Sequence, residues 1–116
     1  QSQFLANIIN DAKNKYNLPI CILGMAFKAN TNLLDGSTAV LLNYQLNNMG
    51  LQPEIYDPNI DSVNIILEKK IYFIGCAHNI FKEYKFVPGS VVIDPHRYIP
   101  KLKDVIYINI GEGNKI

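Results

Sequence analysis

The hydrophobic pattern of this chain consists of short apolar runs separated by turn signals and by segments with helical spacing. Runs of four or more apolar residues that stop at Gly, Pro or Asp are typical of strands buried on both faces of a parallel sheet. Runs of this kind predict strands at residues 20–24 and 71–75, and shorter or interrupted apolar runs predict strands at 54–57, 90–94 and 105–110.

Two segments with helical spacing predict longer helices. The first covers residues 3–16, where one face carries Leu5, Ile8, Ile9, Ala12 and Tyr16. The second runs from Ser37, which can serve as the N-cap, to Met49, with Gly50 at the position where a left-handed residue ends many helices. A strand, a helix and a second strand then follow one another as a βαβ unit.

The rest of the chain is more compressed. We expect a short helix over residues 61–67, with Val63, Ile66 and Leu67 facing inward, and a turn or two of helix over 79–84. Strands that alternate with helices favour one α/β domain, with a mostly parallel five-stranded sheet between two outer layers.

Composition and charge narrow the class of protein. The 116 residues suffice for one compact domain, and the net charge of +1 comes from scattered cations, so neither a nucleic-acid surface nor an acidic tail is predicted. No apolar run approaches the roughly 18 residues of a membrane span, and no signal peptide is visible. Cys21 and Cys76 both lie in or beside apolar runs and are expected to be buried free thiols in a reducing compartment, the cytoplasm.

Polar residues follow most of the predicted strands. Because the carboxyl ends of parallel strands share one edge of a sheet, the loop carrying Lys28, the Asp57-Pro58 and Asp94-Pro95 pairs, and His78 should converge there. Lys28 could meet a phosphate or a carboxylate, or it could be a solvated loop lysine. Asp57 and Asp94 are turn formers or hold a neighbouring loop or a ligand hydroxyl.

Catalytic and metal motifs are weak. Gly24 stands without the other two glycines of a dinucleotide fingerprint, and the ending of a phosphate-binding P-loop is missing. Cys76 and His78 could form a thiol–imidazole pair, but no third orienting residue is identifiable. His78 and His96 with Asp94 lack a recognised ligand spacing. The sequence therefore predicts no catalytic residue and no metal site within this chain.

Residues 22–32, ILGMAFKANTN, resemble the start of the carboxy-terminal domain of the UDP-glucose/GDP-mannose dehydrogenase family, where the pattern is roughly Gly-Leu-Ala-Phe-Lys-x-Asn/Asp-Thr-Asp-Asp. Further similar marks follow in order. Tyr56-Asp57-Pro58 resembles the family's second βα unit, Ala77-His78 with Phe81 its Thr-Asp-His-x-x-Phe segment, and Asp94 with Arg97 its late Asp-x-x-Arg. The resemblance covers about residues 18–100.

The resemblance implies part of an NAD-dependent enzyme that oxidises a sugar nucleotide to a uronic acid for surface polysaccharide. Residues 1–17 would lead in from a central catalytic region, and 18–116 would form the sugar-nucleotide-binding domain, with a Rossmann-like fold. NAD would be bound mainly by an amino-terminal domain outside this chain, and the full-length enzyme would be a homodimer. The implied substrate-binding residues are Phe27, Lys28, Asn30 and Arg97. The implied cofactor or cleft-edge residues are Asp35, Asp57, His78 and Asp94.

Two departures from the family pattern bear on these expectations. Asp35 stands where the family has arginine, and an acid there would repel a diphosphate. The stretch from Asp57 to Ile71 is too short for an additional strand, which favours a five-stranded sheet of order 2-1-3-4-5. The alternatives are a non-catalytic nucleotide-sugar-binding or subunit-pairing module, and an unrelated flavodoxin-like domain.

Overall fold

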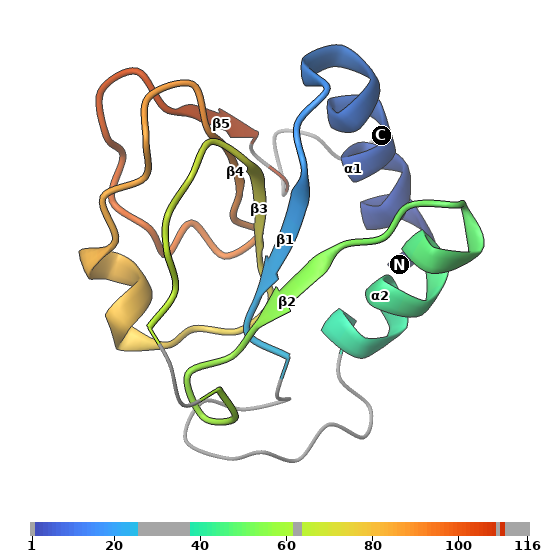
Figure 1. The fold of residues 1–116 in the computed structure, drawn as a ribbon, viewed down its shortest axis with the longest axis horizontal. Coiled ribbons are helices and arrows are strands. Elements are labelled where there is room, and N and C mark those ends of the chain that lie inside the picture. Colours follow the sequence, from blue (N-terminus) through green and yellow to red (C-terminus); the bar gives the residue numbers. More distant parts are fainter. Residues whose placement is uncertain (1, 26–37, 62–63, 109, 111–116) are drawn as a thin grey trace.

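The computed structural model describes residues 2–25, 38–61, 64–108 and 110, and its elements follow the predicted order (Figure 1). They are α1 (Ser2–Tyr16), β1 (Ile20–Leu23), α2 (Thr38–Asn48), β2 (Glu54–Tyr56), β3 (Ile71–Ile74), the 3-10 helix η1 (Asn79–Glu83), β4 (Val91–Ile93) and β5 (Ile106–Ile108). Each observed strand lies inside its predicted range and is one to three residues shorter.

The five strands form one sheet in the order β2-β1-β3-β4-β5, and every pair is parallel, which confirms the predicted fold class and strand order. In the central register Ile22 pairs with Phe73, and Phe73 pairs with Ile93. All residues of β1, β3 and β4 are buried, as expected for strands covered on both faces.

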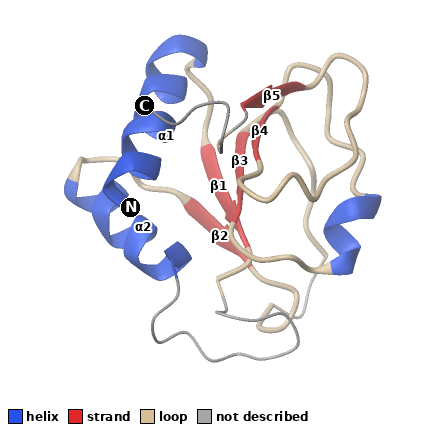
Figure 2. Ribbon diagram, turned by 180° about the vertical axis from the view of Figure 1, so that it is seen from behind, coloured by secondary structure: helices blue, strands red, loops and turns tan. Residues whose placement is uncertain are grey.

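Alternate residues of each strand point to opposite faces of the sheet and build two separate cores. On the helical face, Ile22, Phe73 and Ile93 pack against α1 and α2, which lie side by side. On the other face, Leu23, Tyr72 and Val92 pack against η1 and against irregular chain. Figure 2 shows the two long helices on one side of the sheet and the single short helix on the other.

The prediction of a helix over residues 61–67 is wrong for the residues that the structure describes there. Residues 64–69 contain no helix, Ile66 is 76% exposed rather than inward, and Ile65 and Leu67 pack instead on the second core. Val63 lies outside the described residues. Tyr72 fixes the segment, because its hydroxyl donates to the carbonyl of Glu68 and accepts from the Glu68 amide.

The reason for the missing helix is distance. β2 ends at the carboxyl edge of the sheet and β3 begins at the opposite edge, so the segment between them must cross the sheet. A seven-residue helix advances about 10 Å, whereas extended chain covers about 3.3 Å per residue. Residues 64–70, which the structure describes, therefore cross the sheet without a helix. No helix in the described part of the chain is long and apolar enough to cross a membrane.

Candidate functional site

The strand order places a topological switch point between β1 and β3. From β1 the chain moves outward to β2, whereas from β3 it moves the other way to β4 and β5. The connections therefore diverge at the carboxyl ends of β1 and β3. Open α/β sheets bind their ligands at such a switch point.

Two glycines allow the ends of β1 and β3 to approach closely. Gly24 has a φ of 88°, and a Cβ at this position would lie 2.8 Å from Cys76 Sγ. A Cβ at Gly75 would overlap the carbonyl oxygen of Gly24. Side chains at these two positions would push the ends of β1 and β3 apart.

Asp57 ties the end of β2 to the end of β1. Its side chain is 1% exposed; Oδ2 accepts a 2.7 Å hydrogen bond from the Met25 amide, and Oδ1 accepts one of 2.8 Å from the Asn59 amide. Asp61 Oδ2 in turn accepts from the Asp57 amide at 2.8 Å. Asp57 thus closes its own turn and also holds the chain that leaves β1.

Cys76 and His78 follow β3 and face Asp57. His78 Nε2 lies 3.6 Å from Asp57 Oδ1, and the imidazole meets the Phe81 ring edge-on at a centroid distance of 5.2 Å. One ligand atom from each of Asp57, Cys76 and His78 lies within 4.8 Å of the other two, and all three residues are buried. We call these three residues the switch-point trio.

The Cys76 thiol is not poised as a nucleophile in this setting. Burial raises its pKa from 9.0 to about 11, and the nearby carboxylate of Asp57 adds to the increase. A reactive cysteine needs the opposite, an environment that stabilises the thiolate. This observation disfavours the thiol–imidazole pair considered from the sequence.

Asp94 and Arg97 lie at the same edge, one strand beyond β3. Asp94 is buried, its Oδ2 accepts a 2.6 Å hydrogen bond from the Ile99 amide, and its carbonyl accepts one from the Arg97 amide at 3.1 Å. Arg97 is exposed and has a φ of 54°. Arg97 and Lys101 line a small cavity of about 100 Å³, together with Asp94 and Tyr107. The end of β4 therefore carries positive charge over a buried carboxylate.

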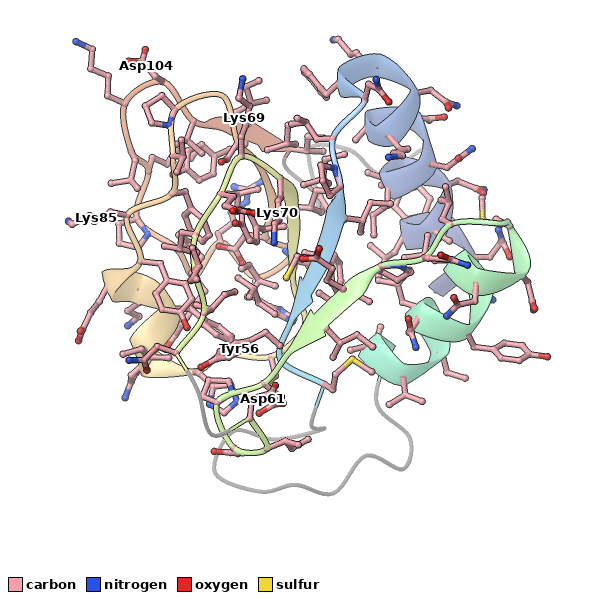
Figure 3. The ribbon with its side chains drawn as sticks, in the orientation of Figure 1. Tyr56, Asp61, Lys69, Lys70, Lys85 and Asp104 are labelled. Atoms are coloured by element: carbon pink, nitrogen blue, oxygen red, sulfur yellow. The ribbon has the colours of Figure 1, made fainter. Side chains whose placement is uncertain are left out.

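A larger groove opens beside the end of β2. It has a volume of about 480 Å³, within the range of small-molecule sites, and Tyr56 and Tyr84 are among the residues that line it. Burial, with Tyr56 alongside, raises the pKa of Tyr84 to about 12, so this phenol stays neutral. Figure 3 shows Tyr56 and Asp61, which both line the groove, together at this end of the sheet.

The structure brings together some of the predicted site residues. Asp57 and His78 meet at the switch point, and Asp94 and Arg97 meet at β4, whereas Phe27, Lys28, Asn30 and Asp35 lie outside the described residues. The metal-ligand set considered from the sequence, His78 and His96 with Asp94, is not the cluster that forms. Within the described chain, the cluster with close ligand atoms contains Asp57 and Cys76 beside His78.

The proximity of Cys76 to Asp57 was not predicted from the sequence. The available signal was that each follows a strand next to β1, because residues after neighbouring parallel strands meet at one edge.

No protein-family model matches the chain, and no curated protein matches it.

Proposed function

We propose that this chain is the sugar-nucleotide-binding domain of an NAD-dependent dehydrogenase that converts a UDP-sugar or GDP-sugar to its uronic acid. One observation carries the proposal. The described residues that match the marks of the resembled family, Asp57, His78, Asp94 and Arg97, all follow β2, β3 or β4 at the carboxyl edge of one parallel sheet. Residues that span 41 positions of sequence thus lie at one edge of the sheet, which supports a shared ligand site there.

The edge has complementary features for a sugar nucleotide. The Tyr56–Tyr84 groove offers flat apolar surface for a base or a sugar ring, and Arg97 with Lys101 offers positive charge for a diphosphate. From β2 to β4 the edge spans three strand spacings, about 14 Å, which suits an elongated ligand. Phe27, Lys28 and Asn30, the other substrate-binding residues that the resemblance implies, would contribute to the same site.

This role leaves the chemistry to other parts of the enzyme. Amino-terminal and central domains would bind NAD and supply the catalytic residues, and the whole enzyme would act as a cytoplasmic homodimer in polysaccharide synthesis. The second candidate is a module that binds a nucleotide sugar or pairs with an enzyme subunit without catalysis. Asp35, an acid where the resembled family has arginine, favours this second candidate.

Titration of the isotope-labelled 116-residue chain with UDP-glucose, UDP and GDP-mannose, followed by NMR, tests the proposal. We expect millimolar binding, because the missing domains would supply most of the cleft, with shifts at Asp57, His78 and Arg97. The Arg97→Gln variant should bind about three- to tenfold more weakly, because it removes a cation facing the diphosphate.

The matched control is Lys103→Gln, which removes an exposed cation near the same loop but outside the small cavity. It should leave affinity unchanged. Absence of shifts at the carboxyl edge with all three ligands would overturn the proposal. So would shifts confined to the groove of about 470 Å³ between Lys13 and Gly50. Tighter binding of the uridine ligands or of GDP-mannose identifies the base that the site prefers.

A further inference from the structure

The switch-point trio combines three different metal-ligand donors in a buried position. Asp57 offers a carboxylate oxygen, Cys76 a sulfur and His78 a ring nitrogen, and one such atom from each lies within 4.8 Å of the others. Asp57 follows β2 while Cys76 and His78 follow β3, so three chain positions on either side of β1 converge on one point.

The ring nitrogen of His78 is an independent sign that this point is built for a ligand. Nε2 is buried and has no hydrogen-bond partner among the residues that the structure describes, and the side chain is 7% exposed. Its distance of 3.6 Å from Asp57 Oδ1 is too long for a hydrogen bond. Buried polar atoms are almost always satisfied, so an unsatisfied nitrogen facing a carboxylate calls for a third group between them.

The spacing of the donors fits a tetrahedral cation. Zinc bonds of about 2.0–2.3 Å place neighbouring ligand atoms about 3.3–3.7 Å apart. The Nε2–Oδ1 distance of 3.6 Å already lies in that interval. The widest separation in the trio, within 4.8 Å, requires side-chain movements of about 1 Å.

Neighbouring groups hold the donors in place. The amides of Met25 and Asn59 each donate to the Asp57 carboxylate, which fixes its plane. Gly24 has no side chain to displace the Cys76 sulfur. Outer contacts of this kind orient the ligands of metal sites.

We propose that Asp57, Cys76 and His78 bind a zinc ion at the switch point of the sheet. The sulfur and nitrogen donors select zinc over magnesium or calcium, which prefer oxygen ligands alone. Zinc is normally four-coordinate, so the trio leaves one position for water or for an oxygen of a bound molecule, such as a phosphate or a hydroxyl. This site does not depend on the proposed function.

Metal titration of the purified 116-residue chain, stripped with a chelator and kept reduced, tests the site. We expect one equivalent of Co²⁺ to bind and to give the near-ultraviolet charge-transfer band of a cobalt–thiolate bond. Zn²⁺ should displace it with a Kd of about 1 µM or tighter, and Mg²⁺ should not. Cys76→Ser and His78→Gln should each weaken zinc binding by more than the roughly 10–100-fold lost on removing an outer contact.

Matched controls use the other cysteine and the other histidine of the chain. Cys21→Ser removes the second buried thiol, and His96→Gln removes an exposed imidazole, and neither should change the band or the affinity. Circular dichroism of the metal-free variants verifies that each is folded, and His78→Gln provides a second route if Cys76→Ser is not.

Three outcomes would overturn the proposal. One is the absence of a thiolate band in the folded wild-type chain. Another is equal zinc affinity in Cys76→Ser, His78→Gln and wild type, which would indicate adventitious binding elsewhere. The third is loss of the band in Cys21→Ser instead. None of these outcomes would alter the nucleotide-sugar titration, so the two proposals fail separately.

Discussion

The two Asp-Pro pairs of the chain follow strands of the same sheet, yet the carboxylates of Asp57 and Asp94 have different hydrogen-bond partners. Asp57 reaches an amide 32 residues away at Met25, and so ties β2 to the end of β1. Asp94 accepts from Ile99, five residues on, and so closes only its own loop. An identical dipeptide thus marks a turn in both places, while the neighbouring strand decides whether the side chain has a long-range partner.

The two carboxylates also differ in how many of their oxygen atoms accept hydrogen bonds. Both oxygens of Asp57 accept backbone hydrogen bonds, whereas Asp94 Oδ1 is buried without a hydrogen-bond partner among the described residues. Asp57 faces a thiol and an imidazole, and Asp94 lies beside the cavity that Arg97 and Lys101 line. Asp57 therefore joins the ends of two strands, whereas Asp94 lies beside two basic side chains.

Removing each carboxylate should give the largest measurable contrast. Asp57→Ala leaves one buried and one partly buried amide donor without their charged acceptor, and we expect a loss of about 3–5 kcal/mol in the free energy of unfolding. Asp94→Ala breaks one such bond and should cost about 1–3 kcal/mol. Urea unfolding followed by circular dichroism measures both. Equal losses would mean that the bond to Met25 contributes nothing beyond the turn.

The sequence predicted most of the fold, because its signals there are periodic and local. Helix 3–16 and all five strands were found within a few residues, and the strand order followed from the short stretch after Asp57. The helix over 61–67 was wrong, because helical spacing over seven residues says nothing about the distance that the segment must cross. Ile66 looked inward by spacing and is exposed in the structure.

The site was predicted less completely than the fold. Asp57 and His78 were expected at one edge, and they do meet. The sequence places Cys76 at the same edge, but its distance from Asp57 depends on how closely β1 and β3 approach at Gly24 and Gly75. Sequence spacing gives the edge on which a side chain lies, but not a separation of 4.8 Å between ligand atoms.

A smaller difference between Asp57 and Asp94 should appear in how stability depends on high pH, through the titration of Cys76. The pKa of Cys76 is raised to about 11 in the folded chain from 9.0, so the unfolded chain loses this proton first. The stabilisation is therefore complete below pH 9 and is lost as the pH rises toward 11. Over the whole interval the loss is about 2–3 kcal/mol.

Asp57→Asn should narrow this interval, because the negative charge of Asp57 contributes to the raised pKa of Cys76. Asp94→Asn should leave it unchanged. Unfolding free energies between pH 8 and pH 10.5, with chelator present and in a Cys21→Ser background, give the comparison. The background is required because burial also raises the pKa of Cys21, to about 12. Identical pH profiles for the two Asn variants would show that the charge of Asp57 does not contribute to the raised pKa of Cys76.

The smallest expected effect concerns Asp61, the exposed residue whose side chain supports the Asp57 turn from outside. Its Oδ2 accepts from the Asp57 amide at 2.8 Å, in a partly buried position that water can reach. Asp61→Ala should cost about 0.5–1.5 kcal/mol in urea unfolding, and Asp61→Asn only a few tenths, because the amide oxygen can still accept. If instead Asp61→Ala destabilised the chain as much as Asp57→Ala, the carboxylate of Asp57 would owe its position to the turn rather than to its bond with Met25. Asp57 and Asp94 would then differ only in the stability of their turns.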